Sequence, residues 1–430
     1  MKVALYIPCY NSEKTISACL DGVLSQVYPL DEILIIDDGS VDKTAEILSK
    51  YPVRIIRHAK NMGLAAARNS ALSNIKSELV ASLDSDCRPD KNWLKHLVNS
   101  MRSLKTAGSG GKVIEAKTSG MFNAWRSVHM KQHWGERKKN NPDFLFGSNT
   151  LFHREALLKA GAYRKAYRNN YEDVDISYRL KKLGYSLAYE PKAVAYHLRD
   201  DDIQSLLNNF WRWNFNYYLK KGSYATPARF IFKVKDNIGM ANRFLEEDLR
   251  KKRYKLIYLD FLIFLHHNLR DFDYFSSRSR QVDSSLLKYS KASIWLSFLD
   301  LAFFYHYDHD KKNLSTFLPG KSVFQHNFFA LNLVLRDFIH KRFKSSKFRK
   351  LLFKHLITSV YRINDNLLME KLYNLTELHQ DWSGLFKKRH FNLNAKFLKV
   401  MLYDLERWMQ NLEKRFPGLI KLIENSAKDN

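Results

Sequence analysis

The sequence is poor in cysteine, and its few cysteines are scattered. Cys9, Cys19 and Cys87 are the three cysteines among 430 residues, and they show no paired spacing. Such a set argues against a disulfide framework and against a zinc site. It favours a reducing cytosol in which the three thiols are small buried side chains.

Long hydrophobic runs are also missing. The apolar run after Met1 and Lys2 ends at Pro8 and is too short for the core of a secretory signal. The most apolar later segments, 256–265 and 294–305, each contain an Asp and fall short of the ~18 residues that span a bilayer. We expect both segments to be buried helices.

Negative charge is the third deficit. The chain has 44 Asp and Glu against 71 Lys and Arg, a formal net charge of +27. Residues 216–430 hold 39 Lys and Arg against 21 Asp and Glu, so most of the excess lies in the second half. Such a surface attracts phospholipid head groups, nucleic acid or phosphate-bearing substrates, and charge alone does not choose among them.

Two different patterns divide the chain, whose length suits two or three domains. Short apolar runs at 2–8, 32–37, 53–57 and 79–84 alternate with helical patterns at 15–26, 44–50 and 65–75. This alternation predicts an α/β domain with a mostly parallel, Rossmann-like sheet. In such sheets ligands bind at the carboxyl ends of the strands.

From about residue 205 the strand signals fade. Amphipathic patterns predict helices at 250–267, 293–305, 327–343, 351–368 and 394–416. We therefore predict an α/β domain over 1–215 and an all-α, basic and aromatic-rich domain over 216–430.

Polar clusters follow the four predicted strands. In chain order they contain Pro8, Tyr10 and Asn11; Asp38; Asn61, Gly63 and Arg68; and Asp84, Ser85 and Asp86. Two carboxylates separated by one residue at a strand end can project together toward a divalent ion, and oxygen ligands suit Mg²⁺ or Mn²⁺. Asp38 can accept a hydrogen bond from a base, Asp84 can reach ribose hydroxyls, and Arg68 can hold a phosphate or a base carbonyl.

Each cluster has a simpler interpretation when it is taken alone. Asp37-Asp38-Gly39-Ser40 is typical of a turn with a helix cap, and an isolated Asp-x-Asp is common by chance. The order and spacing of all four clusters on one α/β frame favour a functional site.

The run from Val3 to about Leu198 resembles the family-two glycosyltransferases with the GT-A fold. The match rests on the four clusters above and on two later motifs: Gly147-Ser148-Asn149 with Arg154-Glu155-Ala156, and Glu172-Asp173. In the family, the first later motif is the acceptor-side strand with its helix, and the second is the catalytic-base motif. The C-terminal half has no such resemblance.

The resemblance implies an inverting, metal-dependent transfer by a hexosyltransferase-type enzyme. Asp173, beside Glu172, would be the general base, and Asp86 the main ligand of Mn²⁺ or Mg²⁺. Asp84 would bridge metal and ribose, and His197 is a candidate third ligand. The resemblance also implies that Ser85, Asn149 and Arg212, together with the residues of the four clusters, bind the nucleotide-sugar donor. Alternatives stay open: Asp173 as a helix cap, His197 as a structural residue, and the Trp211–Trp213 segment as a membrane-facing helix or as interdomain packing.

The same resemblance implies the partners. They are a nucleotide-sugar donor, with uridine diphosphate as the favoured carrier, and a hydroxyl acceptor on a glycan, a lipid-linked glycan or a protein. The basic segment 117–143 falls where the family has a variable acceptor loop, and we expect it to be irregular and mobile before substrates bind. The helical half would handle the acceptor, an anionic membrane surface or self-association, in the cytoplasm or on the inner face of the membrane.

Two other classes of function compete with this interpretation. The charge and the 14% aromatic content permit a nucleic-acid-binding protein, but the sequence has no recognised module for it, so no nucleic acid is expected as a partner. A non-catalytic binding or scaffolding protein on a glycosyltransferase fold is the other alternative. Because Asp84, Asp86 and Asp173 are all present, we do not expect the glycosyltransferase fold to have lost its catalytic activity.

Overall fold

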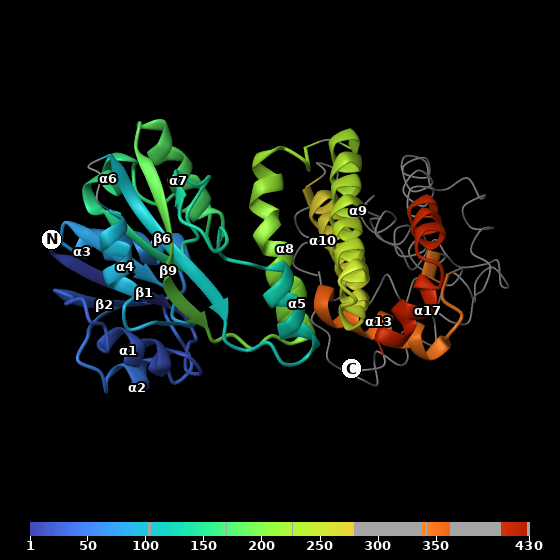
Figure 1. The fold of residues 1–430 in the computed structure, drawn as a ribbon, viewed down its shortest axis with the longest axis horizontal. Coiled ribbons are helices and arrows are strands. Elements are labelled where there is room, and N and C mark those ends of the chain that lie inside the picture. Colours follow the sequence, from blue (N-terminus) through green and yellow to red (C-terminus); the bar gives the residue numbers. More distant parts are fainter. Residues whose placement is uncertain are drawn as a thin grey trace, which may run out of the picture. The chain divides into compact units, whose positions relative to one another are not determined.

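The computed structural model describes residues 1–101, 105–168, 170–225, 227–278, 338–339, 342–361 and 406–427. The chain divides into two compact units, Met1–Asp201 and Asp202–Asn430. Figure 1 colours their elements along the sequence.

The first unit is built on one mixed sheet. Its strands follow the order β3-β2-β1-β4-β8-β6-β9-β5, and β7 pairs with β9. The bounds are β1 Val3–Cys9, β2 Glu32–Asp37, β3 Arg54–Arg57, β4 Leu79–Leu83, β5 Cys87–Pro89, β6 Thr106–Glu115, β7 Lys139–Asn140, β8 Asn149–His153 and β9 Ser186–His197. The four strands predicted from the sequence form the parallel block β3-β2-β1-β4, which confirms that part of the prediction.

Beyond β4 the sheet mixes directions. Strand β8 runs antiparallel to both β4 and β6, whereas β6 and β9 run parallel to each other. The GT-A architecture expected from the resemblance is thus present in the first unit: a largely parallel sheet extended by antiparallel strands.

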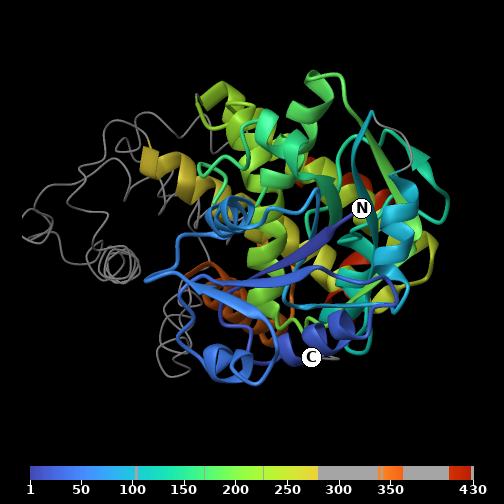
Figure 2. The same cartoon turned by 90° about the vertical axis from the view of Figure 1, so that its left-hand side faces the viewer.

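Helices cover both faces of this sheet, as Figure 2 shows above and below the blue strands. Their bounds are α1 Ile16–Leu24, α2 Thr44–Leu48, α3 Leu64–Asn74, α4 Trp93–Ser100, α5 Met121–His129, α6 Arg154–Lys159 and α7 Glu172–Lys182. One core, on the face of α1 and α4, includes Leu20 and Trp93, and the other, on the face of α3, α6 and α7, includes Leu72 and Ile176.

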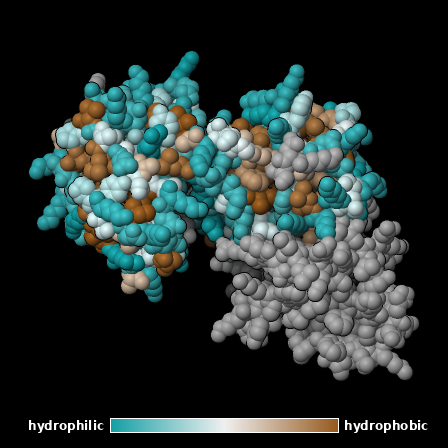
Figure 3. All heavy atoms as spheres, turned by 90° about the horizontal axis from the view of Figure 1, so that it is seen from below, coloured by the Kyte–Doolittle hydropathy of each residue, from teal (hydrophilic) through white to brown (hydrophobic). Residues whose placement is uncertain are grey.

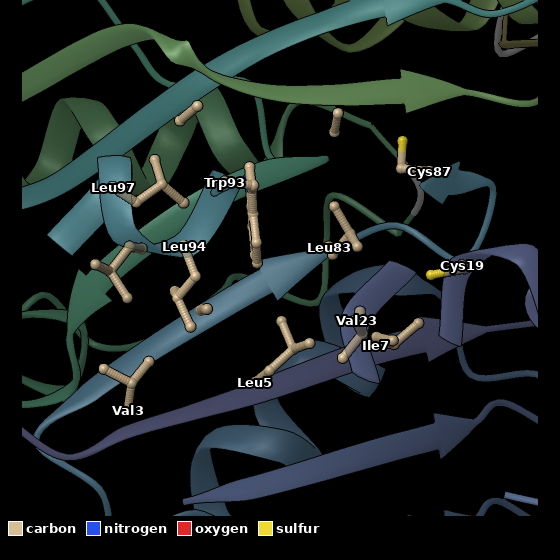
Figure 4. Close-up of a cluster of buried hydrophobic side chains, with 14 of the residues drawn as sticks. Val3, Leu5, Ile7, Cys19, Val23, Leu83, Cys87, Trp93, Leu94 and Leu97 are labelled. Atoms are coloured by element: carbon tan, nitrogen blue, oxygen red, sulfur yellow. The ribbon is translucent and has the colours of Figure 1, made fainter. Parts of the chain in front are cut away.

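The central strand β1 explains why both faces are covered. Successive side chains of a strand point to opposite sides, and every residue of β1 is buried. Val3, Leu5 and Ile7 pack into the core of α1 and α4, where Figure 4 shows them with Val23 and Trp93. Ala4 and Tyr6 belong to the opposite core. Cys9, Cys19 and Cys87 are buried free thiols, as predicted.

Parallel pairing brings the strand ends to one edge. Cys9, the last residue of β1, lies beside Asp37, the last residue of β2, and Asp37 lies beside Arg57 at the end of β3. Strand β4 runs in the same direction on the other side of β1. The polar clusters that follow these strands therefore share the edge at which ligands bind in such sheets.

The prediction of an irregular loop over 117–143 is wrong in part. Helix α5 and the short strand β7 form within it, and Trp125, Arg126 and Met130 are buried. The segment was expected to be a loop because it is basic. It contains an amphipathic helix, and one of its basic residues, Arg126, is on the buried side of that helix. The proposed acceptor role of this segment stays a prediction.

Every regular element that the structure describes in the second unit is a helix. The elements with bounds are α8 Ile203–Lys220, α9 Pro227–Arg250, a 3₁₀ turn at Tyr254–Leu256, α10 Ile257–Arg278, α13 Ser346–Tyr361 and α17 Leu419–Ser426; residues 406–415 are also helical. All of Ile257–Leu265 is buried, which confirms the buried helix predicted at 256–265. The helix predicted at 293–305 and most of those predicted at 327–343 and 394–416 lie outside the described residues.

Among the described residues, no helix is both long and apolar enough to cross a membrane. On the face drawn in Figure 3, the hydrophobic residues of the described part lie in separate patches between hydrophilic ones.

The core of the second unit contains a buried polar centre at Asp271. Its carboxylate accepts from Trp211 Nε1 at 2.9 Å and from the Tyr224 hydroxyl at 2.7 Å, and it pairs with Lys233 Nζ at 2.8 Å. Trp211 is thus an interior residue of this unit.

The boundary between the units differs from the predicted one. The division falls at Asp201–Asp202, whereas the sequence placed it after residue 215, inside α8. Helix α8 begins at Ile203 because Asp202 caps it: the Asp202 carboxylate accepts from Ser205 N at 2.7 Å, and the Ser205 side chain accepts from Asp202 N at 3.0 Å. The role of the helical unit stays a prediction.

Candidate active site

Hydrogen bonds join the polar clusters at the common sheet edge. Asn11, at a positive φ of 51°, donates its N–H to Ser40 Oγ and accepts from Val41 N at 2.9 Å. The hydroxyls of Ser12 and Ser85 lie 2.8 Å apart, which ties the first cluster to the fourth. Tyr10 is 46% exposed, whereas Pro8 is buried within β1 and cannot contact a ligand by its side chain.

Asp38 is a buried residue that shapes the next loop. Its carboxylate accepts from Met62 N at 2.9 Å and from Gly63 N at 2.7 Å, and it lies 2.6 Å from His58 Nδ1. Gly63 adopts φ +94°, and a Cβ there would lie 2.3 Å from Arg168 Cγ. Asp38 therefore holds the Asn61–Gly63 loop in place, and its predicted contact with a base stays a prediction.

Arg68 lies beneath the site and is 1% exposed. Its Nη1 donates to Ser82 Oγ and to the Gly147 carbonyl, each at 3.0 Å, and its Nη2 donates to Asp84 Oδ1 at 3.3 Å. Its Nε lies 3.7 Å from Glu172 Oε1. These partners use the guanidinium internally, so the structure gives Arg68 a supporting position in place of the open phosphate contact expected from the sequence.

The two carboxylates of Asp84-Ser85-Asp86 have different partners. Asp84 is held by Arg68, whereas Asp86 Oδ2 lies 3.2 Å from His197 Nε2. The Asp84 side chain is 32% exposed, yet burial among the surrounding protein atoms raises its pKa to about 6. Although burial pushes it upward, the charge of His197 holds the pKa of Asp86 well below its usual range. Asp86 thus stays a charged acceptor.

Asp86 and His197 form the best candidate metal site among the described residues. Ligand atoms of Asp86, Cys87 and His197 all lie within 4.8 Å of one another. Burial raises the pKa of the Cys87 thiol well above its usual range, so the thiol stays neutral and is a poor ligand. One carboxylate and one imidazole, with Asp84 two residues before Asp86, suit Mn²⁺ or Mg²⁺.

Asp173 sits in the first turn of α7, and its carboxylate contacts Gly147, just before β8. Asp173 Oδ2 accepts from Gly147 N at 2.9 Å, and the Gly147 carbonyl accepts from Arg68. A Cβ at Gly147 would lie 2.8 Å from Arg68 Nη2 and 3.1 Å from Asp173 Cβ. One glycine residue therefore sets the spacing between Asp173 and the guanidinium that holds Asp84.

The backbone before Asp173 is strained. Helix α7 begins at Glu172, and its N-cap is Tyr171 at φ +79°, a left-handed conformation that non-glycine residues rarely adopt. Asp173 is therefore inside the helix and is not its cap. Strain of this kind is found at functional sites, where the surrounding structure holds it in place.

Glu172, predicted beside Asp173 as a catalytic residue, lies away from the surface. It is 3% exposed, and its Oε2 has no hydrogen-bond partner among the described residues. Burial, with the neighbouring Asp173 charge, raises the pKa of Glu172 to about 8. Glu172 supports Arg68 and does not reach a position where it could touch a substrate.

Three further residues that were predicted to bind the nucleotide sugar have different surroundings. Asn149 is fully buried: it accepts from Trp93 Nε1 at 2.6 Å and donates to the carbonyls of Lys112 and Ala193, so any effect on donor binding is indirect. Asn61 accepts from Arg168 Nη2 through its backbone and side-chain oxygens. Arg212 lies on α8 of the second unit, and its role stays a prediction.

Sequence reasoning missed four residues of the site: His58, Glu115, Arg126 and Arg168. His58 joins Asp38 to Ser70, and Arg168 covers the Asn61–Gly63 loop. Glu115 and Arg126 surround the far side of His197. None of the four lies in a motif, and the neighbours of Glu115 follow only from the pairing of β6 with β9.

Comparisons with known proteins agree with the geometry. Residues 5–161 match the family model described as glycosyl transferase family 2. A poly-beta-1,6-N-acetyl-D-glucosamine synthase of Staphylococcus epidermidis is 28% identical over 49% of this chain and 53% of its own length. Glycosyltransferase AglE of Haloferax volcanii is 27% identical over 45% of this chain and 66% of its own length. The chain thus spans about half the length of the first of these curated relatives.

Among solved structures, this chain is similar to a mannosyltransferase from Pyrobaculum calidifontis in complex with GDP-Man and Mn²⁺. It has a TM-score of 0.40 and 18% identity, and it covers 69% of this chain and 80% of its own.

We predict that Mn²⁺ binds to Asp86 and His197. Mn²⁺ should raise the melting temperature of the wild-type chain, and Asp86→Asn should remove this shift because the ion loses its charged ligand. Electron paramagnetic resonance of free Mn²⁺ measures the binding directly. Asp31→Asn, which makes the same change at an exposed residue, is the control. Equal Mn²⁺ affinity of Asp86→Asn and wild type would exclude this site.

Glu172 should make the stability of the first unit depend on pH. A carboxyl whose folded pKa is raised stabilises the fold at pH values below its unfolded pKa and loses this contribution as pH rises through about 8. Glu172→Gln, which cannot ionise, should therefore gain stability relative to the wild type between pH 6 and pH 9. Urea unfolding at pH 6 and at pH 9 measures the free energy of unfolding of both proteins. If this free energy falls equally in the wild type and in Glu172→Gln, Glu172 is not the group responsible.

Proposed function

We propose, from the match of residues 5–161 to the model of glycosyl transferase family 2, that the protein transfers a sugar from a nucleotide-diphosphate sugar to a hydroxyl acceptor. The observation that carries this proposal is the placement of Asp86 and His197 3.2 Å apart on the sheet edge that also presents Asp84 and Asp173. Charged oxygen ligands and a separate carboxylate are what such a transfer needs.

Asp173 is the proposed general base. Gly147 N–H holds one of its oxygens, and the half-buried side chain keeps the carboxylate close to the edge. In an inverting transfer the acceptor hydroxyl attacks the anomeric carbon from the side opposite the leaving nucleoside diphosphate, and Asp173 takes the hydroxyl proton as the bond forms. The rigid start of α7 fixes the position of this base.

Asp86 and His197 would hold Mn²⁺ or Mg²⁺, with Asp84 beside them for the ribose. When bound, the ion supplies positive charge against the negative charge that develops on the β-phosphate of the leaving group. Arg68 keeps Asp84 in position through its Nη2. Tyr10 and Asn11, exposed at the end of β1, and the Asn61–Gly63 loop would face the nucleotide.

The acceptor is proposed to belong to a cell-surface glycan, a lipid-linked glycan or a glycosylated protein. The two relatives named above are a poly-beta-1,6-N-acetyl-D-glucosamine synthase and a glycosyltransferase, which supports a glycan acceptor. The positive charge of residues 216–430 supports a contact with an anionic acceptor or with the cytoplasmic face of an anionic membrane.

A panel of nucleotide sugars tests the donor. We expect one of UDP-, dTDP- or GDP-sugars to raise the melting temperature in the presence of Mn²⁺ and not in the presence of EDTA. A ligand at one hundred times its Kd adds about 2.7 kcal/mol to the free energy of unfolding. If no nucleotide sugar stabilises the chain in Mn²⁺, the proposed reaction is wrong.

Asp173→Asn separates the base from donor binding. The amide oxygen can still accept from Gly147 N, so the fold and the donor-induced shift should be kept, whereas nucleoside diphosphate release should fall by about 10²–10⁴-fold. Release is measured with the stabilising donor, with and without added glycan. Glu46→Gln, which changes an exposed carboxylate on α2, is the control. Unchanged release in Asp173→Asn would rule out this residue as the base.

A further inference from the structure

His197 lies where three neighbouring strands meet. In the sheet order β6-β9-β5, the last residue of β9 is His197, which is paired in register with Glu115 at the end of β6 and with Cys87 at the start of β5. Asp86 directly precedes Cys87. The two ring nitrogens of His197 therefore face two different carboxylates, Glu115 at the end of β6 and Asp86 just before β5.

The inner nitrogen faces Glu115. His197 Nδ1 lies 3.0 Å from Glu115 Oε2 and 3.1 Å from Oε1, and the side chain of Glu115 is 8% exposed. Arg126 Nη2, which can only donate, lies 3.3 Å from the same nitrogen, but both oxygens of Glu115 are nearer. A carboxylate can only accept a hydrogen bond, so this closer contact favours a proton on Nδ1. The lone pair of a neutral imidazole is then on Nε2, the nitrogen that lies 3.2 Å from Asp86 Oδ2.

Glu115 is itself held by a buried arginine. Arg126, 3% exposed on α5, donates from Nε to Glu115 Oε1 at 3.0 Å and from Nη1 to Asp201 Oδ2 at 2.9 Å. Asp201 also accepts from Arg199 Nε at 2.9 Å. The carboxylates of Glu115 and Asp201 are almost fully buried, and the Arg126 guanidinium supplies a positive charge to both.

We propose that Glu115 is a positioning residue, held by Arg126, that fixes the orientation and tautomer of His197 so that Nε2 binds the divalent ion together with Asp86. The inference rests on the proposed function, because it concerns the metal of that site. It also gives α5 a role, since this helix brings Arg126 to the metal side of the sheet. Carboxylates that bind the far nitrogen of a metal-ligating histidine typically change metal affinity 10–100-fold when they are replaced.

A purely structural role of the same ion pairs has a different signature. If Glu115 and Arg126 only attach α5 to the end of β9, their loss lowers the melting temperature but leaves the metal affinity of the folded protein unchanged. Metal affinity measured well below the melting temperature therefore separates the two roles.

The test compares Glu115→Gln with Glu190→Gln in the whole chain. Glu190 is a matched control: it is a buried carboxylate on β9, seven residues before His197, paired with Lys138 Nζ at 2.7 Å and in register with Gly111 of β6. The Kd for Mn²⁺, alone and with UDP, is measured at one pH by electron paramagnetic resonance. We expect Glu115→Gln to weaken Mn²⁺ binding about tenfold or more and Glu190→Gln to leave it unchanged.

Each other result is decisive. Unchanged affinity in Glu115→Gln, with Asp86→Asn still defective, overturns the role of Glu115 and leaves the metal site standing. A wild-type chain that does not bind Mn²⁺ with or without UDP overturns the metal site itself. If Glu115→Gln does not fold, Glu115→Asp takes its place, because it keeps the charge but withdraws the acceptor by one methylene. Its Mn²⁺ affinity should also fall, and an unchanged value contradicts the inference.

Discussion

The buried guanidinium of Arg68 is the interaction on which the rest of the site depends. It joins Ser82 of β4, Asp84 at the end of that strand, the Gly147 carbonyl before β8 and Glu172 of α7. Leaving a buried charge without its partner costs about 3–5 kcal/mol, so the arginine and its carboxylates must be placed together. Gly147, whose N–H donates to Asp173, links the proposed base to the same group.

A second buried arginine organises the opposite side of the edge. Arg126 binds Glu115 and Asp201, and Glu115 in turn faces His197. Each arginine is thus surrounded by carboxylates, one group around Asp84 and Asp173 and the other around Asp86 and His197. This division explains why Asp84 and Asp86, two residues apart, have different surroundings. Their difference supports separate roles, with Asp86 toward a metal ion and Asp84 toward the ribose.

The predictions from sequence succeeded where local pattern and order carry the information. The four parallel strands, their helices and the polar clusters at their ends follow from periodicity and chain order. The errors concern residues whose environment is set by distant segments. Pro8, Asn149 and Glu172 occupy motif positions but are buried, because strand pairing and the start of α7 turn them inward. The segment 117–143 looked irregular because its helix buries an arginine against two carboxylates outside the segment, Glu115 and Asp201.

The sequence by itself determined the parallel block of the first unit and the common edge that carries Asp84 and Asp86. Spacing along the chain is enough for this, since the carboxyl ends of parallel strands meet at one edge. Only the tertiary structure decided which carboxylate meets which cation. Glu115 comes beside His197 through the register of β6 with β9, and Arg126 reaches them through a helix that no motif marks. Such pairings depend on contacts between strands and helices far apart in the chain.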